Sequence, residues 1–440
     1  MRYQFISRRK VLKAEPTPDY PPAHIHSLPP EILTEIFGHV NSKPGLVNLG
    51  QTCRRFHQLT VKHIYRELDF NAIKFIEFGI NHLPLPKKRG IKESSSCINV
   101  IKSITITKPP IPNVQRSIKI AGSYNIETSD DNSTYNTFVQ VFRSLLTESY
   151  SIQKITLDEV APNFAFPSDT SRKSSSSVFR KPSKQIRRHL PHLTLKTQSG
   201  WTLPARLNQF SAIFDYFDEI DHLELVNFII DDDFDNATIV KTAVIKKVTF
   251  SGCKYSAKKR KVIPLLSSCN TISLERIGAQ RDLSLIDYVR GSTDSLSDLE
   301  IDMDSALFYN IIGGNKVLNF SKYNPFFRLV CSGEGRYATL KHVFLKNFDI
   351  STCVEKNFLE QDDWVIDDQG LGGFLRDMGI VKRLTIQIKS NKVCLKCGHI
   401  NEDASVEHKV WHKIFKQLEG TNLTIWGPNR LIYKNFSTIS

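Results

Sequence analysis

One apolar pattern returns along most of this 440-residue chain and limits what the chain can fold into. Each copy has an apolar residue, two spacers, an apolar residue, one spacer and a third apolar residue, as in Ile101, Ile104 and Ile106. Such alternation is typical of a short strand that buries every second side chain. The later copies are Ile152/Ile155/Leu157, Leu190/Leu193/Leu195, Ile220/Leu223/Leu225, Ile245/Val248/Phe250, Cys269/Ile272/Leu274, Leu296/Leu299/Ile301, Leu340/Val343/Leu345, Val381/Leu384/Ile386 and Gly420/Leu423/Ile425.

The spacing of these copies indicates a repeat. The steps between the middle residues Leu193, Leu223, Val248, Ile272 and Leu299 are 30, 25, 24 and 27 residues. Apolar residues at helical spacing lie between the strands, over 135–147 and more briefly over 306–312. The chain therefore resembles an irregular leucine-rich-repeat solenoid, an α/β fold of short parallel strands with intervening helices and loops. The alternative is an unrelated set of buried strands in an α/β domain.

Residues 25–70 precede the repeats and show a different pattern. Ser27 is a candidate helix cap, and Pro30 suits a first helical turn because its missing N–H has no partner there. Three groups of apolar residues at helical spacing follow. Three helices this short cannot bury all that apolar surface among themselves, so an uncovered face implies a partner or a second domain.

The same stretch closely resembles an F-box. The resemblance rests on Leu28, Pro29, Glu31, Ile32, Leu33, Ile36, Phe37, Leu46, Leu49, Cys53, Arg54, Arg55 and Phe56. One departure is Gln51, where an apolar residue is more usual. The resemblance implies three helices that dock onto the Skp adaptor of a cullin–RING ubiquitin ligase. The adaptor-binding residues would be Leu28, Pro29, Glu31, Ile32, Leu33, Ile36, Phe37, Leu46, Leu49, Cys53 and Phe56. The alternative is an ordinary three-helix cap on a larger core.

Composition predicts the character of the remaining segments. We expect a disordered basic tail over 1–24, a linker over 71–97 and a repeat domain over 98–440 with a disordered, serine-rich basic insert at 168–188. The net charge of +14 favours acidic or phosphorylated partners, but no base-reading motif supports nucleic-acid binding. No apolar run reaches the ~18–20 residues of a membrane helix, and no secretory signal is evident. We therefore expect a protein of the cytoplasm, the nucleus or both, without a membrane partner.

The spacers of the repeated pattern point to the other face of each strand. Threonine recurs at the central spacer, where its β-branched side chain suits an exposed strand. One part of this face places acids beside bases and aromatic residues, which suits a protein or peptide ligand. The predicted substrate-binding residues are Asp298, Glu300, Asp302, His342, Phe344, Lys346, Arg383 and Trp426.

One cysteine–histidine set has metal-ligand chemistry. Cys394 and Cys397 are followed by His408 and His412, which are four residues apart on a predicted helix, so the four could hold a structural zinc. The alternative is a pair of loop cysteines with two exposed histidines. We expect no other cofactor.

The sequence contains no phosphate-binding loop, serine elbow or metalloprotease helix, so we expect no enzymatic activity. The predicted function is a substrate receptor of a Skp–cullin–F-box ubiquitin ligase that recruits a protein target through the repeats. The alternative is a Skp-bound structural or scaffold protein that does not direct ubiquitination.

Overall fold

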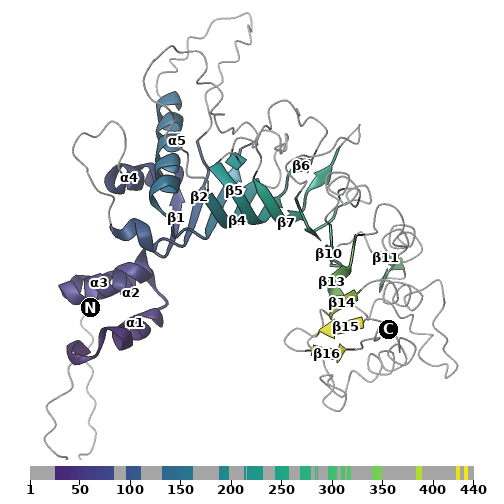
Figure 1. Ribbon diagram of the computed structural model, residues 1–440, viewed down its shortest axis with the longest axis horizontal. Helices are drawn as coiled ribbons and strands as arrows, with labels where there is room; N and C mark the ends of the chain where they lie inside the picture. Colours follow the sequence, from purple (N-terminus) through teal and green to yellow (C-terminus); the bar gives the residue numbers. More distant parts are fainter. Residues whose placement is uncertain are drawn as a thin grey trace, which may run out of the picture. The chain divides into compact units, whose positions relative to one another are not determined.

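The structure is a computed structural model (Figure 1). It describes residues 25–83, 96–110, 131–161, 188–197, 213–214, 216–230, 243–256, 268–278, 283, 285, 296–304, 309–312, 315–318, 339–348, 383–388, 423–426 and 431–434. The chain divides into two compact units, which meet in the sequence between Arg66 and Glu67. No helix in the described ranges is long and apolar enough to cross a membrane.

The N-terminal unit consists of a short 3-10 helix and three α-helices. They are η1 (Ile25–Ser27), α1 (Pro30–Gly38), α2 (Lys43–Thr52) and α3 (Arg54–Ile64). Pro30 occupies the first turn of α1 as predicted, but Ser27 lies in η1, and Pro29 is the N-cap without a side-chain hydrogen bond. The other two helices each have a side-chain N-cap. Ser42 Oγ accepts from Gly45 N at 3.2 Å, and Cys53 Sγ accepts from Phe56 N at 3.4 Å.

This unit has a small apolar core of its own. Leu33, Phe37, Leu46 and Phe56 form one buried cluster, and the rings of Phe37 and Phe56 meet edge to face with centroids 5.1 Å apart. Gly50 lets α2 approach α3 closely, because a Cβ at that position would lie 2.7 Å from Thr60 Oγ1. The three helices therefore pack as a unit around two phenylalanines.

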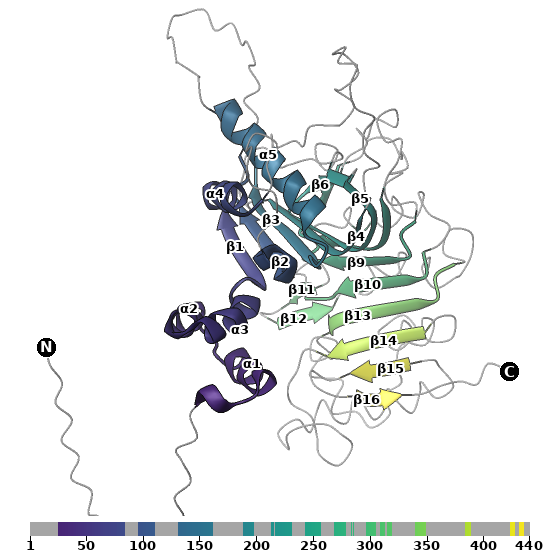
Figure 2. The same cartoon turned by 60° about the vertical axis from the view of Figure 1, so that its left-hand side comes forward.

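The second unit is built on a 12-stranded sheet. Its order is β1-β2-β3-β4-β5-β7-β9-β10-β13-β14-β15-β16, and every neighbouring pair is parallel except β15 and β16. Figure 2 shows β16 pointing against β14 and β15. The strands are β1 (Glu67–Asn71), β2 (Ser103–Thr107), β3 (Lys154–Val160), β4 (Arg188–Thr197), β5 (Phe217–Val226), β7 (Val244–Ser251), β9 (Thr271–Glu275), β10 (Asp298–Asp302), β13 (His342–Phe348), β14 (Arg383–Ile388), β15 (Leu423–Trp426) and β16 (Leu431–Lys434).

The ten predicted strands are all present, and their patterns lie in register. Ile104 pairs with Ile155, Ile155 pairs with Leu193, and the same match continues along the sheet to Leu384 and Leu423. The middle apolar residues of β2 to β14 are fully buried, as is Ile101 at a first position. Each copy of the pattern therefore adds one parallel strand and one layer of the core.

The sheet begins one strand earlier than predicted. Leu68 and Phe70 of β1 pair with Ile104 and Ile106, although we expected the repeat domain to start at residue 98. The predicted linker 71–97 is also partly structured. It contains α4 (Ala72–His82) and ends in the 3-10 helix η2 (Ser96–Val100), and Phe75 of α4 is fully buried.

Helix α4 packs against α5 (Asp131–Glu148), which confirms the helix predicted over 135–147. The centroids of Phe75 and Phe138 lie 5.4 Å apart. Gly79 of α4 faces Val141 so closely that a Cβ there would lie 2.1 Å from Val141 Cγ1. The pair gives the first strands a helical layer, and Figure 1 shows α4 and α5 beside β1 and β2.

The helix predicted over 306–312 is wrong. Strand β11 (Tyr309–Ile312) pairs antiparallel with β12 (Asn315–Leu318), because two glycines separate two short β-prone runs. A second small sheet joins β6 (Ile229–Ile230) and β8 (Lys254–Tyr255) in parallel. Residue 188, the last of the predicted insert, begins β4. The predicted tail 1–24, the rest of the insert, and Cys394, Cys397, His408 and His412 lie outside the described residues.

Candidate functional site

The three N-terminal helices leave part of their apolar surface uncovered. On α1, Ile32 and Ile36 are 44% and 39% exposed, and Val47 on α2 is 40% exposed. Ile32 and Ile36 lie one turn apart, so they share a face of α1 that the core cluster does not use. A helix with apolar residues on more than one face is normally covered on both. These three exposed side chains are therefore candidates for contact with a partner.

The predicted adaptor-binding residues fall into three groups. Pro29, Glu31, Ile32 and Ile36 are exposed, whereas Leu28, Leu49 and Cys53 are half-buried. Leu33, Phe37, Leu46 and Phe56 lie in the core, where they hold the helices together. The structure thus separates a surface set from a packing set, which the sequence pattern had combined. It also adds Val47 to the surface set. The only sign of this in the sequence was the position of Val47 between the apolar residues Leu46 and Leu49.

Within the basic pair Arg54 and Arg55, it is Arg55 that has a structural role. Arg55 Nη2 donates to the carbonyl oxygen of Leu28 at 2.6 Å, and Nη1 donates to that of His26. These bonds tie the segment before α1 to α3, because a guanidinium can hold two acceptors at once. Gln51, the departure from the expected pattern, is exposed.

The second candidate surface is the polar face of the sheet in the other unit. The spacers do point away from the apolar core, but the central threonines are not exposed as predicted. Thr156, Thr194, Thr249 and Thr385 are each less than 8% exposed. Neighbouring strands are only about 4.8 Å apart, so larger side chains on both sides cover them.

An ion-pair network crosses the middle of this face. Lys247 Nζ on β7 reaches across β9 to Glu300 Oε1 on β10 at 2.6 Å, and Lys346 Nζ on β13 binds Glu300 Oε2 at 2.6 Å. Lys346 also lies 3.8 Å from Glu275 Oε1. Burial alone would raise the pKa of Glu300, but the two ammonium groups hold it below its usual range. Glu300 and Lys346 are therefore bound to each other and to residues that the sequence had not singled out.

Other predicted substrate contacts are also engaged within the sheet. His342 Nδ1 lies 3.3 Å from Asp298 Oδ1, and Nε2 lies 2.8 Å from Thr385 Oγ1. Burial is the main cause of the lowered pKa of His342. Asp302 Oδ1 accepts from Asn347 Nδ2 at 3.0 Å.

The remaining predicted contacts are more accessible. Phe344 is half-buried, and its ring lies parallel to that of His342 with centroids 6.4 Å apart. Arg383 is exposed at the start of β14. Trp426 ends β15, and its side chain lies outside the described residues. The structure brings the predicted residues of β10, β13 and β14 together on adjacent strands.

A histidine pair lies further along the same face. The rings of His192 and His222 are 4.4 Å apart, and Glu224 Oε2 lies 3.4 Å from His192 Nε2 and accepts from Thr194 Oγ1 at 3.0 Å. Burial, followed by the neighbouring His192, lowers the pKa of His222 to about 4. The bond to His192 lowers the pKa of Glu224 to about 2.

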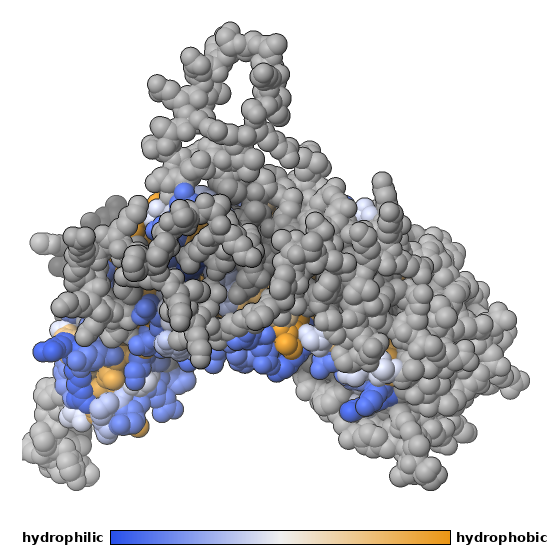
Figure 3. Space-filling model, turned by 45° about the horizontal axis from the view of Figure 1, so that its top comes forward, coloured by the Kyte–Doolittle hydropathy of each residue, from blue (hydrophilic) through white to orange (hydrophobic). Residues whose placement is uncertain are grey.

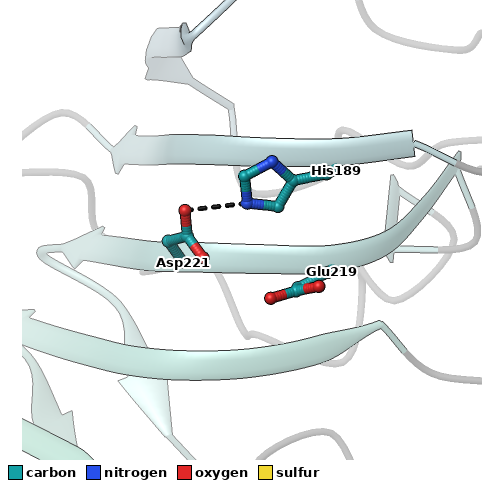
Figure 4. A group of neighbouring side chains, drawn as sticks. All are labelled: His189, Glu219 and Asp221. Carbon is teal, nitrogen blue, oxygen red and sulfur yellow. Dashed lines mark hydrogen bonds and ion pairs between the residues drawn. The ribbon is translucent and has the colours of Figure 1, made fainter.

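A third group has donor types that could suit a metal ion. His189, Glu219 and Asp221 have ligand atoms within 4.8 Å of one another, and Figure 4 shows His189 directed at Asp221. Nζ of Lys246, however, lies 2.8 Å from Asp221 Oδ1 and also bonds Glu219. That bond to Lys246 is the main cause of the lowered pKa of Asp221. The ammonium group of Lys246 thus already binds both carboxylates.

The described thiols lack the features of a catalytic nucleophile. Cys253 and Cys269 are buried, and burial raises the pKa of each to about 12. Cys53 caps α3 and packs against the core of the helical unit. The described thiols thus give no support for cysteine-based catalysis.

Two comparisons with known proteins bear on these surfaces. No curated protein matches the chain. Residues 25–71 match the model of the F-box-like family, and this range covers α1 to α3 and the first strand of the sheet. Proteins of this family are in general non-catalytic substrate adaptors. The exposed face of α1 and the match agree, and the chain therefore carries an F-box-like domain at residues 25–71.

Proposed function

We propose that this protein is the substrate receptor of a Skp–cullin–F-box ubiquitin ligase. Its helical unit binds the Skp adaptor, and its sheet recruits a protein target for ubiquitination. Bringing the target to the ubiquitin-loaded enzyme raises the local concentration of target lysines, so the receptor itself needs no catalytic group. Such a protein works in the cytoplasm, the nucleus or both.

The observation that carries this proposal is the uncovered apolar face of α1 and α2. Complete burial of an isoleucine is worth about 1.5–3 kcal/mol, so covering the exposed two fifths of Ile32 or Ile36 is worth about 0.6–1.2 kcal/mol. Val47 adds a similar amount. The core below is complete without these side chains. A partner can therefore use this surface without opening the three helices.

Adaptor capture tests the proposal. The double substitution Ile32→Asp and Ile36→Asp removes the apolar contact and places two charges in the interface. We expect affinity for purified Skp adaptor to fall at least about 100-fold, with the helices still folded because both sites are exposed. The matched control is Ile73→Asp on α4, an isoleucine that is 64% exposed in the other unit. Equal capture of all three proteins would refute the proposal.

Substitution of Leu28 is a less suitable test of the same surface. Leu28 is half-buried against the helical core, and its carbonyl oxygen accepts from Arg55. A loss of adaptor binding in Leu28→Ala would therefore combine a changed contact with a loosened fold. The exposed pair on α1 avoids this ambiguity.

We further propose that the sheet unit is an irregular leucine-rich-repeat solenoid. Support comes from a backbone feature that recurs four residues after the middle apolar residue of a strand. At this position Lys108, Glu159, Asn227, Gly252, Arg276 and Asn347 all have positive φ. Left-handed backbone costs about 1–2 kcal/mol for most residues, so its return at one register position indicates repeated units.

Hydrogen bonds give that recurring position a function in the repeat. Asn227 N donates to Ser251 O of the next strand at 2.9 Å, and Gly252 N donates to Glu275 O at 2.9 Å. Side chains reach back in the opposite direction, as Asn227 Nδ2 does to Thr197 O at 3.0 Å. The turn at Asn227 thus links three successive strands.

Recovery of cullin decides between a receptor and a scaffold. A receptor should copurify with cullin as well as Skp, and blocking the proteasome should raise the level of its target. Recovery of Skp without cullin would instead favour a structural protein that does not direct ubiquitination.

A further inference from the structure

The charged residues on the polar face differ in whether they already have an ion-pair partner. Glu300 is held by Lys247 and Lys346, and Asp298 by His342. A group that already has a close partner offers a ligand fewer free hydrogen-bonding positions and less uncompensated charge. These residues therefore form a fixed polar frame and are poor candidates for direct recognition.

Phe344 lies within this polar frame but is an aromatic residue. The central outward positions of β2 to β15 are otherwise threonine, serine or glutamate, so Phe344 is the only aromatic residue among them. His342 stacks beside it, and Lys346 Nζ lies 5.7 Å from its ring centroid. A half-exposed aromatic ring that is held rigidly by polar neighbours is the usual centre of a binding hot spot.

Two cations lie where the strands β13 and β14 begin, before Phe344 in the strand direction. Lys341 and Arg383 are both exposed, and the backbones touch, since Arg383 N donates to Lys341 O at 3.0 Å. Neither has an ion pair with any residue in the described ranges. At the other end of the strands, β10 finishes at Asp302 with Asp304 just beyond it, whereas β13 and β14 end in Phe348 and Ile388. Within the described ranges, Lys341 and Arg383 are thus exposed cations without an ion pair at this end of β13 and β14, while Asp298 at the start of β10 is held by His342.

We propose that this surface, formed by Lys341, Phe344 and Arg383, binds a peptide segment of a partner that carries an apolar side chain next to an aspartate or glutamate. The apolar side chain covers the Phe344 ring, and the carboxylate lies over Lys341 and Arg383. The inference rests on the proposed function, because it names the class of segment that marks a target. The surrounding ion pairs keep the ring and the frame in place before binding, which lowers the entropic cost of association.

Peptide selection on the full-length chain tests the inference. Random 12-residue peptides are displayed on phage and selected against the protein, and the enriched peptides are then synthesised with a fluorescent label. We expect them to share an apolar residue close to an acidic one. By fluorescence polarisation, Phe344→Ala should weaken binding at least about tenfold.

Charge exchange gives a second readout with an exposed residue that does not support the fold. Arg383→Glu should weaken binding about tenfold at low salt, and changing the peptide acid to lysine should restore it. The matched control is Lys154→Glu, also a charge reversal at the same outward position but on β3, which should alter affinity less than twofold. Circular dichroism melting checks that each variant is folded.

Three outcomes would overturn the inference: no enrichment above background, peptides without an acidic residue, or peptides whose affinity is unchanged in both Phe344→Ala and Arg383→Glu. None of these bears on adaptor capture, which is measured on Ile32 and Ile36 in the other unit. A failure of this inference is therefore distinguishable from a failure of the proposed function.

Discussion

The ion-pair network around Glu300 makes a prediction that separates folding from recognition. Replacing Glu300 with glutamine keeps the shape of the side chain but removes the charge that both Lys247 and Lys346 bind at 2.6 Å. Two ammonium groups would then share a partly buried site with Glu275, which is 3.8 Å from Lys346. We expect the variant to be less stable than the wild type.

The burial of these groups sets the size of the effect. The Glu300 side chain is 16% exposed, and those of Lys247 and Lys346 are 29% and 23% exposed. Breaking a fully buried pair costs about 3–5 kcal/mol, whereas an exposed pair contributes about 0–1 kcal/mol. This network lies between those limits, so Glu300→Gln should lower the free energy of unfolding by about 1–2 kcal/mol. High salt should reduce the difference only slightly, because the groups are partly shielded from solvent.

Urea denaturation followed by circular dichroism provides the measurement. The companion variant Lys247→Met, alone and combined with Glu300→Gln, completes a double-mutant cycle that isolates the coupling between the two side chains. We expect the combined variant to lose less stability than the sum of the single variants. Unchanged stability in Glu300→Gln, together with a loss of target binding, would show that Glu300 contacts the ligand and would refute this reasoning.

Three further changes test packing and titration in the sheet unit. Gly79→Ala should lower the melting temperature, since its Cβ would lie 2.1 Å from Val141 Cγ1 and push α4 away from α5; an unchanged melting curve would contradict this close packing. Gly252→Ala should cost about 1–2 kcal/mol in urea denaturation, because φ is +62° and the Cβ would meet Asn227 Oδ1 at 2.7 Å. For His222, the folded pKa of about 4 lies below its ordinary value, so the unfolded state binds more protons and stability should fall as pH falls from 7 to 5. Solvent screening limits this loss to about 1–2 kcal/mol, and His222→Asn should flatten the pH profile measured by urea denaturation.

The repeated apolar pattern predicted the sheet well because it encodes burial directly. In a parallel strand with one face in the core, the alternation of side chains fixes both the face and the register. Leu193, Leu223 and Val248 therefore align in the sheet as they do in the sequence. The same rule could have found β1, since Tyr65, Leu68 and Phe70 repeat the pattern, but they were included in the F-box-like segment.

Segments with weaker patterns were predicted less well. The run 306–312 has apolar residues at spacings that suit either a helix or a strand, and the pairing of β11 with β12 decided between them. The predicted linker contains α4, whose burial depends on contacts with α5 about 60 residues later. Such distant contacts leave no local signal in the sequence.

By itself, the sequence determined the ten strands from β2 to β15 that carry the repeated pattern, which segment is F-box-like and which side chains face the polar surface. It could not divide the F-box-like residues into packing and surface sets, because Leu33 and Ile32 are both apolar and differ only in the direction they take from α1. Nor could it show that Glu300 is neutralised by Lys247, which lies 53 residues away and two strands across the sheet. Only the tertiary structure decided these points. Whether a side chain can contact a partner depends on whether neighbouring residues already cover it or bind it.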